Sequence, residues 1–148
     1  MVEQLEMGFI QICNLSTTSL AQMLALGQYD VVQADITAEN FQIQGVKESV
    51  VPHLYYATGK SQGVVQELAD AGLRTATFVE LLLFAVHHPE EHRKGMIVAI
   101  DDRQVHMLRG NRVVPILHTQ NGHGGKWLSL ERWDCFWDTD YRMAVVPV

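Results

Sequence analysis

The order of local patterns along the chain constrains the fold most, because helix-like segments come first and short β-rich runs follow them. Runs at 96–100, 105–108 and 113–117 are separated by Asp101-Asp102 and by Gly110-Asn111, a two-residue hairpin signal. Helices followed by hairpins are typical of the α+β class. We therefore predict an antiparallel β-meander with two or three helices packed on it.

Capping residues mark where the helices begin. Ser16 to Ser19 can cap a helix whose apolar residues run from Leu20 to Leu26 and which stops at Gly27. Ser61 is expected to cap a second helix over 62–71. Thr77 and Glu80 form a capping box that starts a third at Phe78, and Pro89 breaks or restarts that helix.

Further β-rich runs lie at 50–56, 127–130 and 143–146. A chain of 148 residues has the common size of one domain, and neither a repeat nor a linker divides it. The sequence therefore predicts a single domain over 1–148.

Charge and hydropathy restrict the partners and the compartment. The formal charge is -6, from 17 acidic and 11 scattered basic residues, which argues against nucleic acid. The apolar runs are too short to cross a bilayer, so no membrane segment is expected. Cys13 and Cys135 form neither a disulfide framework nor a metal-ligand spacing. We expect reduced thiols, a cytoplasmic protein and no cofactor, and the oligomeric state stays open.

His87, His88 and His92 with neighbouring glutamates are the densest group of side chains able to bind a metal. The spacing of His88 and His92 puts two imidazoles on one helical face, as zinc sites require, but Pro89 lies between them. We favour a solvated helix end at which cationic histidines complement the helix dipole. A zinc site at His88 and His92 is the alternative.

His118 and His123 flank a glycine-rich loop over 120–125. Its glycines would let backbone amides approach an anion, although no Gly-Lys-Ser or Gly-Lys-Thr follows. A plain turn between strands is the simpler interpretation. The loop is also a candidate for covering a partner.

The segment 127–140 contains three Trp and three Asp residues. Exposed indoles would form a recognition patch, whereas buried ones would belong to the core. The candidate binding residues are Trp127, Trp133, Trp137, His123 and Asp138. Cys135 stands in an acidic setting, which does not favour a thiol nucleophile.

Two resemblances follow from particular residues. Gly72-Leu73-Arg74, Thr77, Glu80-Leu81 and the closing segment 141–146 resemble the joint and last strand of bacterial C-type-lectin-like and formylglycine-generating-enzyme-like domains over residues 61–148. The tripeptides of the lectin calcium site are absent, so calcium-dependent sugar binding is not implied. Segments 27–30 and 36–41 resemble small bacterial proteins without an assigned activity, which implies kinship and no chemistry.

Two functions of different classes are consistent with these patterns. The first, which the sequence favours, is a non-catalytic binding module that recognises a protein or another macromolecule through the Trp-rich segment and the Gly-rich loop. It predicts exposed Trp rings near the loop. The alternative is a small hydrolase or metal-dependent enzyme that uses His118, His123 and an Asp from 134–140. It predicts convergent side chains with perturbed pKa values.

Overall fold

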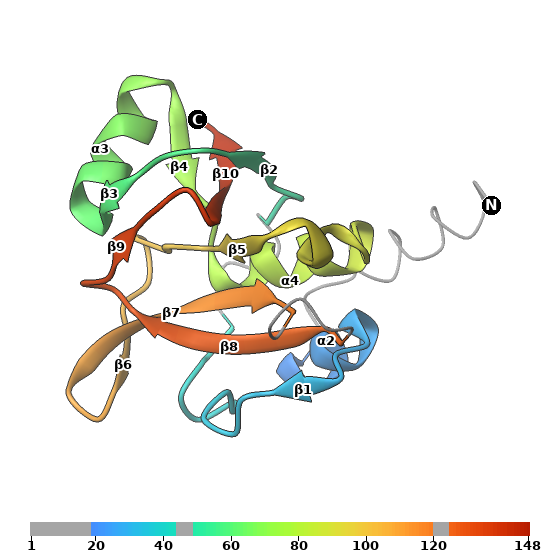
Figure 1. Cartoon of the computed structure of the whole chain (residues 1–148). Coiled ribbons are helices and arrows are strands. Elements are labelled where there is room, and N and C mark those ends of the chain that lie inside the picture. The colour runs from blue at the N-terminus through green and yellow to red at the C-terminus, as the bar shows by residue number, and fades with distance from the viewer. Residues whose placement is uncertain (1–18, 44–48, 120–124) are drawn as a thin grey trace.

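The computed structural model describes residues 19–43, 49–119 and 125–148 (Figure 1). The helices are α2 (Leu20–Gly27), α3 (Ser61–Asp70), α4 (Phe78–His87) and the 3-10 helix η3 (Glu91–Lys94). The strands are β1 (Val31–Val32), β2 (His53–Tyr55), β3 (Gly59–Lys60), β4 (Leu73–Thr75), β5 (Met96–Val98), β6 (His106–Leu108), β7 (Asn111–His118), β8 (Trp127–Arg132), β9 (Phe136–Trp137) and β10 (Tyr141–Pro147). The α+β class is confirmed.

The main sheet is mixed and has the strand order β1-β8-β7-β5-β10-β2, with β4 also paired to β10 and β6 to β7. The pairs β1–β8 and β5–β10 are parallel, so the purely antiparallel meander predicted from the sequence is wrong. β5 and β6 do not form a hairpin together. β7 is eight residues long, and β6 pairs with its first half while β5 pairs with its second.

The β6–β7 hairpin turns at Arg109 and Gly110, one residue earlier than predicted. Both residues have positive φ angles, 50° and 81°, as a type I′ turn requires. Asn111 already pairs with Leu108 and begins β7. Glycine meets this requirement without steric cost, and the tight turn determines the register of the two strands.

Capping boxes begin two of the helices; the box that starts at Thr77 was predicted, whereas Ser19 was predicted only as one of several possible caps. Ser19 and Gln22 cap α2, and Thr77 and Glu80 cap α4. Ser61 is not a cap but the first residue of α3. Its hydroxyl donates a hydrogen bond to the Trp133 carbonyl and accepts one from the Trp137 indole. The tertiary contacts of the C-terminal segment use the hydroxyl that a cap would need.

The core has two parts, one on each face of the sheet. Leu117 and Leu128 pack with α2 and α4, whereas Ile116 and Val114 pack with α3 and Trp137. This division follows from the strand period of two, since neighbouring residues point to opposite faces. The helices therefore cover both faces of the sheet (Figure 1).

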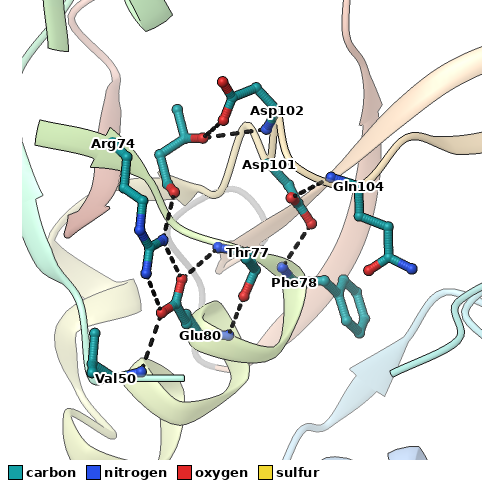
Figure 2. Close-up of polar contacts among 9 residues, drawn as sticks. Val50, Arg74, Thr77, Phe78, Glu80, Asp101, Asp102 and Gln104 are labelled. Carbon is teal, nitrogen blue, oxygen red and sulfur yellow. Dashed lines mark hydrogen bonds and ion pairs between the residues drawn. The ribbon is translucent and has the colours of Figure 1, made fainter. Parts of the chain in front are cut away.

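A polar cluster holds the beginning of α4 against the sheet (Figure 2). Arg74 forms a bidentate ion pair with Glu80, which also accepts hydrogen bonds from the backbone amides of Thr77 and Val50. Burial raises the pKa of Glu80, but these hydrogen bonds outweigh it and hold the pKa below its usual value. The cluster therefore ties β4 and residue 50 to α4 through one ionised carboxylate.

The predicted turn at Asp101-Asp102 also contributes hydrogen bonds to this cluster. Asp101 is buried with a φ angle of 45°, and its carboxylate accepts hydrogen bonds from the backbone amides of Phe78 and Gln104 and contacts His106. A carboxylate at the first turn of a helix is stabilised by the helix dipole.

Among the described residues, no helix is long and apolar enough to span a membrane.

Candidate functional site

The end of β7 and the beginning of β8 place a histidine beside a serine. In the antiparallel register, Ile116 lies opposite Ser129 and His118 lies opposite Trp127. His118 and Ser129 therefore project from the same face of the sheet, diagonally across the strand pair. The Nε2 atom of His118 and the Oγ atom of Ser129 are 2.7 Å apart.

Both side chains of this His118–Ser129 pair are half-buried, and the Trp127 ring lies beside them with its centroid 6.1 Å from that of His118. Burial lowers the pKa of His118, and a hydrogen bond with the backbone of Thr119 opposes the shift only in part. The imidazole is therefore neutral at pH 7. In the tautomer protonated on Nδ1, Nε2 accepts the hydroxyl proton of Ser129.

A nucleophile within hydrogen-bond reach of a neutral base, with the base held by a third group, is the arrangement that activates serine. Here the backbone of Thr119 is the third group. Of the hydrolase residues predicted from the sequence, the structure brings His118 to such a partner. His123 lies outside the described residues.

The predicted aspartates make their contacts elsewhere. Asp134 forms an ion pair with Arg132, and Asp138 accepts a hydrogen bond from the Asp140 backbone amide. Within the described ranges, no three His, Cys, Asp or Glu side chains could hold a metal ion. The contacts of Asp134 and Asp138 do not involve His118.

The three Trp residues do not form an exposed patch. Trp137 is fully buried, with its ring against Tyr141, so its assignment to a binding surface is wrong. Trp133 is half-buried, and the Arg112 guanidinium stacks 3.6 Å from its ring centroid. Trp127 is also half-buried. Phe136 is instead the exposed aromatic of this segment, at 60% of its surface.

The histidines after α4 do not lie on one helical face. His88 is the C-cap of α4, and its ring lies tilted against that of Phe84, whereas His92 belongs to η3. Pro89 separates these helices, so the imidazoles do not share a zinc site. The favoured interpretation of a solvated helix end is also wrong for His92, which is 3% exposed.

Cys135 is a free, half-buried thiol. Burial raises its pKa, and the nearby carboxylates of Glu131, Asp138 and Asp134 add to the shift. The thiol is therefore protonated at pH 7 and a poor nucleophile.

Sequence reasoning missed Ser129. The alternation from Trp127 to Leu130 puts Trp127 and Ser129 on one face, and that signal was available. The partner of Ser129 depends on the β7–β8 register, which no short turn motif determines.

Comparison of the chain with protein-family models, with curated proteins and with solved structures found no significant match.

Proposed function

We propose that the chain is a small hydrolase in which Ser129 is the nucleophile and His118 the general base. The observation that supports this proposal is the 2.7 Å contact between Ser129 Oγ and His118 Nε2, on a partly open face of the sheet. A small hydrolase is the alternative function expected from the sequence, but here Ser129 acts with His118 where the sequence suggested an aspartate or a metal.

The chemistry fits an activated ester. The Ser129 hydroxyl gives its proton to His118 Nε2 while Oγ bonds to the carbonyl carbon of the substrate. The tetrahedral intermediate expels the alcohol, which takes that proton, and leaves an acyl group on Ser129. A water molecule, deprotonated by His118, then releases the acid and restores the serine. The Trp127 ring beside the pair is an apolar wall suited to a small acyl group.

The experiment is acylation by p-nitrophenyl acetate, with release of p-nitrophenol measured and the acetylated residue located by peptide mass spectrometry. We expect acetyl on Ser129, none in Ser129→Ala, and a rate lower by roughly 10²- to 10⁴-fold in His118→Gln. Because the pKa of His118 is lowered, the rate should rise with pH and have its midpoint below the ordinary histidine value. Ser19→Ala, an exposed helix cap, is the control and should react as wild type.

Acetylation elsewhere, or equal rates in wild type and Ser129→Ala, would refute the hydrolase. The pair would then be a cross-strand hydrogen bond that joins β7 to β8.

A binding module is the second candidate function. The observation in its favour is that the turn before β9 is held in place next to the exposed Phe136. Lys60 donates a hydrogen bond to the Asp134 carbonyl, and Ser61 contacts the Trp133 carbonyl. A protein partner is the fitting occupant, since an exposed aromatic ring is a common anchor of protein interfaces. Phe136→Ala is the variant that separates this candidate from the hydrolase. The single domain, the cytoplasmic location and the likeness to C-type-lectin-like domains stay predictions.

A further inference from the structure

A polar cavity of about 150 Å³ lies between the end of α2, the turn after α4 and the beginning of β8. It is separate from the His118–Ser129 pair, because Lys126 points to the face of α2 and α4 whereas Ser129 points to the other face. The side chains that matter in its lining are Gln28, Asp30, Glu90, His92, Arg93 and Lys126.

The formal charges of this lining cancel. Asp30 and Glu90 are acidic, and Arg93 and Lys126 are basic. Glu90 and Arg93 pair at 2.8 Å near the surface, with 70% and 61% of their side chains exposed. Lys126 lies deeper, at 6% exposure. A lining with both signs and no net charge suits a ligand that also carries both.

The Lys126 ammonium carries the most buried charge of this lining and lies 5.1 Å from the centroid of the Tyr29 ring. The Lys126 ammonium has three N–H groups, and two of them donate to the carbonyls of Gly27 and Ala85. His92 also lines the cavity, but its Nδ1 atom is buried and does not reach the cavity surface. The third N–H group of Lys126 is therefore the donor that a ligand in the cavity engages.

We infer that this cavity binds a small zwitterion of the α-amino acid class. The ligand carboxylate accepts a hydrogen bond from Lys126, and the ligand ammonium lies between the carboxylates of Asp30 and Glu90. The size limits the ligand to the smallest members, since the cavity holds the equivalent of about five water molecules. A divalent metal does not fit, because the described acidic groups form no metal-binding set.

The test is a titration of the full chain carrying isotope-labelled histidine, in which NMR monitors the imidazole resonances. The probes are glycine and L-alanine, compared with acetate and methylammonium, which carry one charge each. We expect glycine or alanine to shift the His92 resonances, with each half-molecule binding at least about tenfold more weakly. The His92 resonances are assigned as those that disappear in His92→Phe. The control is His53→Phe, which changes an exposed strand position and should bind glycine as wild type does.

Glu90→Gln and Asp30→Asn test the same site without disturbing the core, because both residues are exposed. Each should weaken glycine binding about tenfold and leave acetate binding unchanged. Absence of any shift with both amino acids overturns the inference, as does acetate binding as tightly as glycine. Ser129→Ala should bind glycine normally, so failure of the hydrolase and failure of this site are distinguishable.

Discussion

Lys126 joins three elements through one side chain. Its ammonium donates to the carbonyl of Gly27, the last residue of α2, and to that of Ala85, in the last turn of α4. The Ala85 carbonyl would normally accept from residue 89, but Pro89 has no N–H. Both carbonyls would otherwise be unsatisfied, and a cation at a helix C-terminus also opposes the dipole charge.

We predict that Lys126→Met lowers the free energy of unfolding by roughly 2–4 kcal/mol, because methionine fills a similar volume but leaves two buried carbonyls unpaired. Urea denaturation followed by circular dichroism measures the change. Lys94→Met is the control, since Lys94 is 69% exposed and its ion pair with Glu91 should matter by less than about 1 kcal/mol. Equal losses for both variants would contradict the capping role.

At the scale of an element, β9 shows how one strand divides its two side chains between core and solvent. Trp137 is fully buried and donates to the Ser61 hydroxyl at 2.7 Å, while the preceding Phe136 points to solvent. The small sheet formed by β3 and β9 is therefore fastened to α3 by an indole. Composition alone does not distinguish these two neighbours.

Trp137→Ala should destabilise the protein by roughly 3–5 kcal/mol, because it leaves a large cavity and removes the hydrogen bond from the indole to Ser61. Phe136→Ala, one residue away, should change the free energy of unfolding by no more than about 0.5 kcal/mol. Thermal and urea unfolding of the two variants give this comparison directly. A large loss in Phe136→Ala would mean that its ring packs within the fold.

For the whole molecule, three histidines link stability to pH. Burial lowers the pKa values of His87, His92 and His118 below the ordinary 6.5. In the pH range below 6.5, the unfolded chain therefore binds more protons than the folded one. Their contribution to stability is complete above pH 6.5 and is lost as the pH falls through the folded pKa values.

The free energy of unfolding should accordingly decrease between pH 7 and pH 5, before the carboxylates titrate. Urea denaturation at half-unit pH steps measures the slope. His118→Gln, which removes one of the three groups, should reduce that slope. A free energy that is constant or rises toward pH 5 would show that these histidines do not control the pH dependence.

The starts of α2 and α4 were predictable because capping boxes and helical periodicity act within a few residues of sequence. The β6–β7 hairpin was predictable for the same reason, to within one residue. Ser61 shows where local reasoning ends. It has the chemistry of a cap, but Trp133 and Trp137, more than seventy positions away, engage its hydroxyl.

The sequence by itself determined the α+β class and the existence of most elements, since caps, turns and apolar periods are local properties. Only the tertiary structure decided which strands pair in parallel, which side chain of β9 enters the core, and that Ser129 meets His118. Each of these depends on strand register and on contacts between segments far apart in the chain. Burial and the choice of hydrogen-bond partner depend on contacts that are distant in sequence, and they decide which polar side chains can contact a substrate or a partner protein.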